Sequence, residues 1–226
     1  MSKRPFLVRV AFSVFLLFTI FTCVCAAQFK VSDNFNRPDG ATGLSWSNWG
    51  AGAQISSNQL ETFGQTSVAG GIARNLDVTF PVSFAFNFST NAPTDGGWQI
   101  AFNAATADGG LLANDTAEIR LLQFRGSGGI CTEFQTASGP MDHCGNPKTG
   151  QRDFTAIARI SGTINPDFSS TVTIRYNDGQ MPASVTIKSP APVGAIQSPL
   201  GSIFFFGNSN ATFGPHFFDN ISLTLK

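Results

Sequence analysis

From residue 31 onward the chain consists of short segments rich in Val, Ile, Thr and Phe, separated by Gly, Pro, Asn and Asp. No stretch sustains the period of an α-helix. The clearest segment is residues 79–90, in which every second residue from Phe80 to Phe88 is apolar. Because successive side chains of a strand point to opposite faces, this alternation predicts a strand that buries one face.

The same pattern marks a series of candidate strands along the chain. They are 31–37, 54–62, 67–75, 79–90, 98–104, 117–125, 130–135, 154–161, 171–176, 183–188, 201–207 and 215–225. So many short strands without helices predict an all-β fold, a β-sandwich of two large antiparallel sheets. The phenylalanines are then expected to pack between the two sheets.

The N-terminal segment has the order of a secretory signal. Lys3, Arg4 and Arg9 precede an apolar run, and Cys25-Ala26-Ala27 supplies the small side chains that a signal peptidase needs. A retained membrane anchor is the competing interpretation, but a spanning helix needs about 20 apolar residues, more than this run contains. We expect residues 1–27 to be a cleaved signal peptide. Residues 28–226 then form one secreted domain, extracellular or periplasmic, with no membrane span after cleavage.

The net charge of the chain bears on which macromolecules it can bind. Without the three basic residues of the leader, 11 Lys and Arg remain against 14 Asp and Glu, which gives a net charge of about −3. A domain of this charge is not expected to bind nucleic acid or an anionic membrane. Only 12% of the residues are charged, so the surface must be mainly neutral and polar, which suits uncharged ligands such as glycans.

The cysteines predict one disulfide. Cys23 and Cys25 leave with the signal peptide, and Cys131 and Cys144 remain. Two cysteines in an oxidising compartment most simply pair, and closing this loop stabilises the fold by roughly 3 kcal/mol on the chain-entropy model. A zinc site is not expected, because the chain has two histidines and no CxxC or HExxH spacing.

Short motifs at both ends of the domain resemble a known superfamily. They are the opening VSDNFNRPDGATGLSWSNWG with AQISSNQLE after it, the hairpin TIRYNDGQMPASVTI and the closing HFFDNISLTL. These motifs resemble the concanavalin A-like lectin/glucanase (laminin-G-like) superfamily. The resemblance spans most of the domain and implies a two-sheet antiparallel jelly-roll β-sandwich. Because that superfamily includes lectins, glycoside hydrolases, lyases and adhesion modules, the resemblance implies a fold rather than an activity.

Two aspartates near the ends of the domain require an explanation. By strand parity Asp33 and Asp219 lie on the apolar faces of their segments, where a carboxylate is costly unless it has a partner. In the glucanase-like and carbohydrate-binding domains that the chain resembles, a calcium is held by backbone carbonyls and an Asp in the position of Asp219. The resemblance therefore implies one structural calcium at Asp33 and Asp219. Pairing with backbone amides or with Arg37 or Arg74 is the alternative that the sequence leaves open.

The sequence lacks the known catalytic patterns of this fold and of common hydrolases. It has no Glu-x-Asp-x-x-Glu strand, no Gly-x-Ser-x-Gly elbow and no metalloprotease motif. Glu118, one of three glutamates, alternates with Arg120 and is expected to pair with it on a sheet face. These absences favour binding over catalysis.

A sugar site needs an aromatic platform with polar side chains around it. Trp46, Trp49, Trp98 and Tyr176 are the available rings. The predicted carbohydrate-binding set is Trp98, Arg120, Gln123 and Arg125. The alternative is that the tryptophans are packing residues of the core.

Three functions are compatible with the sequence. The first is a secreted, non-catalytic domain that binds a cell-envelope surface or a carbohydrate, such as a glycan or a cell-envelope polysaccharide. The second is a polysaccharide-active glycoside hydrolase or lyase with an atypical acid pair. The third is a structural adhesion module that binds protein.

Overall fold

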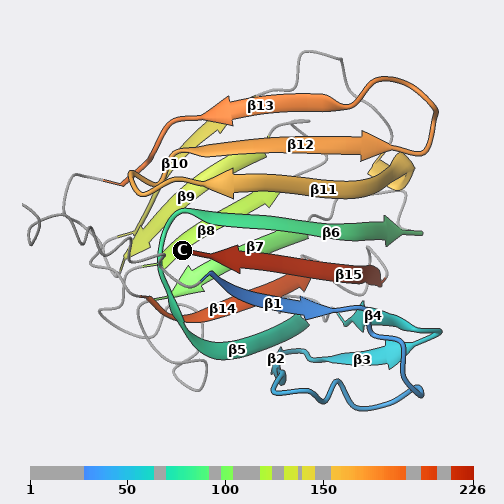
Figure 1. The fold of residues 1–226 in the computed structure, drawn as a ribbon. Coiled ribbons are helices and arrows are strands. Elements are labelled where there is room, and N and C mark those ends of the chain that lie inside the picture. The colour runs from blue at the N-terminus through green and yellow to red at the C-terminus, as the bar shows by residue number, and fades with distance from the viewer. Residues whose placement is uncertain are drawn as a thin grey trace, which may run out of the picture.

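A computed structural model describes the protein over residues 28–63, 70–91, 98–103, 118–123, 130–136, 139–145, 154–191, 200–207 and 215–226. In these ranges the chain forms two antiparallel sheets that face each other as a β-sandwich (Figure 1). The described ranges contain no α-helix, only the 3-10 turn η2 (Phe154–Ala156). None of them forms a helix that could cross a membrane.

One sheet has eight strands and the other has seven. The order in the eight-stranded sheet is β13 (Ala183–Ile187), β12 (Ser170–Tyr176), β11 (Ile157–Ile164), β6 (Val82–Thr90), β15 (His216–Leu225), β4 (Gln59–Thr62) and β3 (Ala53–Ser56), with β1 (Phe29–Asp33) also paired to β15. The order in the seven-stranded sheet is β10 (Gly139–Gly145), β9 (Ile130–Thr136), β8 (Glu118–Gln123), β7 (Trp98–Asn103), β14 (Leu200–Gly207), β5 (Gly70–Val78) and β2 (Ser47–Gly50). The all-β fold predicted from the alternating residues is confirmed.

The core lies between the sheets, as the alternation in β6 predicts. Phe84, Phe86 and Phe88 are buried, while the residues between them are at least partly exposed. Phe86 meets Phe205 of the opposite sheet edge to face, with 5.7 Å between the ring centroids. The phenylalanine stripe is therefore the contact between the two layers and not a ligand-facing surface.

The structure also contains strands that the sequence pattern did not reveal. The candidate segment 54–62 is two strands, β3 and β4, joined by a tight turn in which Ser57 and Asn58 both have positive φ angles. Residues 139–145 form β10, although no candidate strand was predicted in this segment. Composition misled here because β10 is an edge strand, and its side chains from Met141 to Cys144 are exposed.

The edge of β15 is shared by two different strands. On the side of β15 away from β6, β4 pairs with residues 216–218 and β1 pairs with residues 221–225. The register of β15 against β6 shifts between Asp219 and Ser222, and Asn220 has a φ of 49°. This bulge bends β15 where β4 gives way to β1, and the junction positions the candidate site.

Candidate binding site

A hollow of about 390 Å³ lies at the junction of β1 and β15. Its lining consists of Lys30, Ser32, Asp33, Asn34, Leu44, Asn220, Ile221 and Ser222. The volume falls within the range of small-ligand sites, roughly 300 to 1,000 Å³. The sequence-based site did not include these residues, apart from Asp33.

Strand parity places the polar groups of β1 in this hollow. Val31 is buried, and the flanking Lys30 and Ser32 are exposed on the outer face of the sheet. Ser32 stands directly opposite Ser222 in the ladder between β1 and β15. Two hydroxyl groups therefore face the same side of adjacent strands, on a rigid backbone frame.

Asp33 fixes the inner wall of the hollow. Its Oδ1 accepts hydrogen bonds from the backbone N–H of Phe35 (2.8 Å) and from Nη1 of Arg37 (2.7 Å). Its Oδ2 accepts from Nη2 of Arg37 (3.0 Å) and from Nε1 of Trp46 (3.1 Å). The second guanidinium nitrogen also donates to the carbonyl of Thr42. The segment after β1 is thereby folded back onto one buried carboxylate.

This arrangement around Asp33 does not fit the expected calcium. A carboxylate has about four lone-pair sites, and four N–H donors already occupy those of Asp33. The guanidinium of Arg37 at 2.7 Å would also repel a cation. Asp33 is thus not a metal ligand in this arrangement, and the arginine pairing that the sequence left open is what the structure contains.

Asp219 lies at the bulge in β15, beside the hollow. Its carboxylate accepts the backbone N–H of Asn220 (2.7 Å) and the side-chain Nδ2 of the same residue (2.6 Å). Burial raises the pKa of Asp219, the bond from the Asn220 backbone partly offsets this, and the charge of Asp33 raises the pKa further. A calcium held by Asp219 stays a prediction.

The sequence-based sugar platform is wrong for Trp98. The side chain is fully buried, and its ring lies 5.6 Å from that of Phe86, edge to face. A ring enclosed in the core cannot stack on a sugar. The alternative interpretation, that this tryptophan is a packing residue, matches the structure. Trp46 and Tyr176 are buried as well, and Trp49 is half-buried.

Arg120 lies on the outer face of the seven-stranded sheet, but it is engaged by carboxylates. It forms a short hydrogen bond with Glu118 and approaches Oε1 of Glu133 on β9 to 3.2 Å. The predicted pairing of Glu118 with Arg120 is confirmed. The side chain of Gln123 and all of Arg125 lie outside the described residues, so their part in a site stays a prediction.

The carboxylates around Arg120 continue across neighbouring strands. Glu133 stands opposite Arg120 on one side and opposite Asp142 of β10 on the other. Burial raises the pKa of Glu133, Arg120 counteracts this, and the charge of Asp142 adds to the rise. Nearer the centre of this face, Gln99 and Asn103 are buried. The hollow, whose lining consists of described residues, is the better candidate site.

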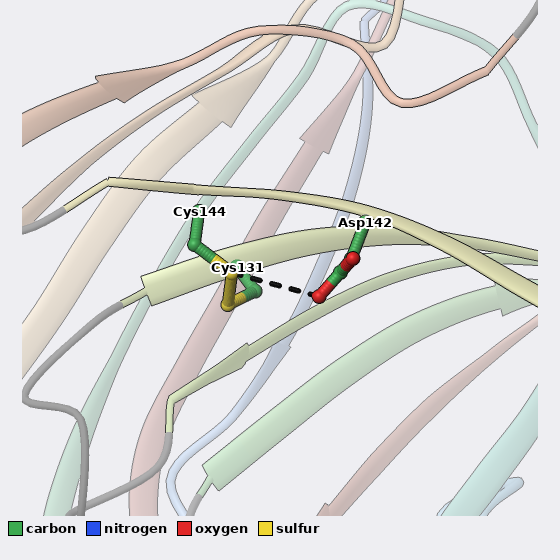
Figure 2. Close-up of side chains that lie close together, drawn as sticks. All are labelled: Cys131, Asp142 and Cys144. Atoms are coloured by element: carbon green, nitrogen blue, oxygen red, sulfur yellow. Dashed lines mark hydrogen bonds between the residues drawn. A yellow bond between two sulfur atoms is a disulfide. The ribbon is translucent and has the colours of Figure 1, made fainter.

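The predicted disulfide between Cys131 and Cys144 is confirmed. The two residues stand directly opposite each other on β9 and β10, with an S–S distance of 1.95 Å. Figure 2 shows the carboxylate of Asp142 beside this disulfide, with Oδ2 3.7 Å from Sγ of Cys144. The three side chains cluster as metal ligands would, but bonded sulfurs offer no thiolate, so the cluster is not a metal site.

Fold comparison shows that the two-sheet β-sandwich of this chain is similar to the jelly-roll folds of solved lectins and of a galectin-like protein. The acidic lectin of winged bean, solved with methyl-α-D-galactose, is 10% identical, covers 88% of this chain and 98% of its own, and has a TM-score of 0.61. A Bacillus subtilis protein with a galectin-like fold is 12% identical, covers 87% of this chain and 96% of its own, and has a TM-score of 0.57. Lectin II from Ulex europaeus is 15% identical, covers 87% of this chain and 97% of its own, and has a TM-score of 0.55. Such identities show the fold alone, and neither a protein-family model nor a curated protein sequence matches the chain.

Proposed function

We propose that the protein is a secreted, non-catalytic carbohydrate-binding module that binds sugar in the hollow between β1 and β15. The observation that carries this proposal is a concavity of about 390 Å³ whose lining combines polar side chains with the apolar Leu44 and Ile221. Secretion is proposed from the leader-like residues 1–27.

Hydroxyl and amide side chains suit a sugar because they both donate and accept hydrogen bonds. Ser32 and Ser222 supply two hydroxyls on paired strands, and Asn34 and Asn220 supply two amides. Leu44 lines the hollow with 67% of its surface exposed. It offers the small apolar surface against which the C–H groups of a sugar ring can pack.

Lectins of the same fold support the proposal by analogy. The acidic winged bean lectin was solved with methyl-α-D-galactose, and another similar structure, lectin UEA-II, was solved with galactose. Both likenesses lie at the level of fold, so the sugar of this protein has to be established by experiment.

The lining of the hollow favours binding over hydrolysis. Glycosidic cleavage usually needs two carboxyl groups, one of them free to transfer a proton. Among the residues that line the hollow, Asp33 is the one carboxylate, and it accepts two hydrogen bonds from Arg37 and one each from Phe35 and Trp46. A polysaccharide-active enzyme could use the carboxylates around Arg120 instead, and release of reducing sugar would reveal it.

A glycan array followed by calorimetry tests the proposal. We expect the domain to retain at least one glycan, and we expect Asn34→Ala and Ser222→Ala each to weaken binding about tenfold, the loss of one to two hydrogen bonds. Asn177→Ala and Ser184→Ala are the matched controls, because both are exposed residues near the opposite edge of the same sheet. The proposal fails if no glycan is retained, or if the hollow variants bind as tightly as the controls.

A further inference from the structure

The hollow contains a cation that has no ion-pair partner among the described residues. Lys30 is exposed on β1, stands opposite Thr224 and lines the hollow. The ion pairs found in the described part of the chain involve only Arg37 and Arg120. The ammonium group of Lys30 is therefore available to an anionic ligand.

The carboxylate of the hollow does not compete for that ligand or for Lys30. Arg37 neutralises the charge of Asp33 through two hydrogen bonds, of 2.7 and 3.0 Å. The remaining lone pairs accept the N–H groups of Phe35 and Trp46. Asp33 thus forms part of the wall without presenting a free anionic acceptor.

The two amides of the hollow are oriented by their neighbours. Oδ1 of Asn34 accepts the backbone N–H of Asn36 (3.2 Å), which identifies the oxygen and leaves the amide nitrogen to donate elsewhere. Asn220 donates one Nδ2 hydrogen to Asp219 (2.6 Å) and retains its second. With the ammonium of Lys30 and two hydroxyls, the hollow offers more free donors than acceptors.

We propose that the hollow selects acidic glycans, with a uronic-acid carboxylate of the ligand placed against Lys30 and the amide of Asn34. A carboxylate is the acceptor-rich, negatively charged group of a sugar that this donor set complements. This inference rests on the proposed carbohydrate-binding function and specifies its substrate class.

The test compares acidic glycans with neutral copies of the same backbones. Oligosaccharides of galacturonan, alginate and hyaluronan are titrated by calorimetry beside their carboxyl-reduced forms, at low and at high salt. We expect at least one acidic glycan to bind at least tenfold more tightly than its reduced form. That preference should shrink as salt rises, because exposed charges are screened.

The variant Lys30→Gln assigns the preference to this residue. Within this variant, the ratio of the affinity for the acidic glycan to the affinity for its reduced form should fall close to one. Lys188→Gln is the matched control, because Lys188 is an exposed lysine beyond β13, at the opposite edge of the sheet. It should keep the preference.

The outcomes separate the two proposals. If neutral and acidic forms bind equally, or if Lys30→Gln keeps the preference, the acidic selectivity is overturned while carbohydrate binding stands. If no glycan of either kind binds to the wild type, both proposals fall.

Discussion

Asp33 connects the first strand to the segment that follows it. Its side chain is 2% exposed, while that of Arg37 is 19% exposed, so the pair sits at the boundary between core and solvent. The hydrogen bond from Nε1 of Trp46 joins this carboxylate to a residue 13 positions further along the chain. Removing this acceptor leaves several buried donors without a partner, which costs far more than the net value of the bonds themselves.

We therefore expect Asp33→Ala to lower the free energy of unfolding by about 3 kcal/mol or more, the cost of breaking a buried, hydrogen-bonded ion pair. Urea denaturation measures the change. Asp77→Ala is the control, because Asp77 is exposed on β5, and it should stay within about 0.5 kcal/mol of the wild type. A loss below about 1 kcal/mol for Asp33→Ala would contradict the role assigned to this network.

The burial of Trp98 leads to a second prediction about a single residue. Because its side chain is fully buried against Phe86, Trp98→Ala should destabilise the domain by about 3 to 5 kcal/mol through the cavity that it leaves. Met181→Ala, at a position 80% exposed, should change stability little. A Trp98→Ala domain with unaltered stability and weakened glycan binding would instead restore the sugar-platform interpretation.

At the scale of the element, β8, β9 and β10 bring like charges together. Glu133 has Arg120 on one side and Asp142 on the other. Its pKa is raised above the ordinary value of 4.5, chiefly by burial. In the pH range just above 4.5 the Glu133 carboxyl is therefore more protonated in the folded protein than in the unfolded chain. The stability that the protonated Glu133 carboxyl gives the folded state is lost as pH rises through that range.

The variant Glu133→Gln has no titratable carboxyl group at this position. We expect the melting temperature of the variant, relative to the wild type, to increase as the pH is raised from about 4 to about 7. Thermal melts of both proteins in matched buffers measure the difference. The Glu133 assignment is contradicted if the difference is constant or decreases over this range.

The elements also show where sequence patterns succeed. Alternation located β6 and β12 because each packs one apolar face against the opposite sheet. It also located β15, but the bulge at Asn220 changes the parity of that strand, so the prediction that Asp219 lies on the apolar face is wrong. Alternation failed for β10, whose edge position needs no apolar face, and for the short β2. The disulfide was predictable from the count of cysteines, because two remaining thiols have one possible pairing.

At the scale of the whole molecule, the hollow was not predictable from the sequence. Parity places Ser32 on the outer face of the predicted strand 31–37, which does not include Lys30, and it does not show what lies beside either residue. The surroundings of these residues depend on long-range strand pairing. Both β4 and β1 pair with the same edge of β15, which lies at the C-terminal end of the chain. For Trp98, strand parity did not show which face of β7 meets the core, and in fact all six of its residues are buried.

The central claim is that a glycan occupies the hollow between β1 and β15. A crystal structure of the domain with the tightest-binding glycan from the array tests it most directly. The account predicts electron density for sugar against Ser32, Asn34 and Ser222. Density over the carboxylates around Arg120, with the hollow free of sugar, would contradict it.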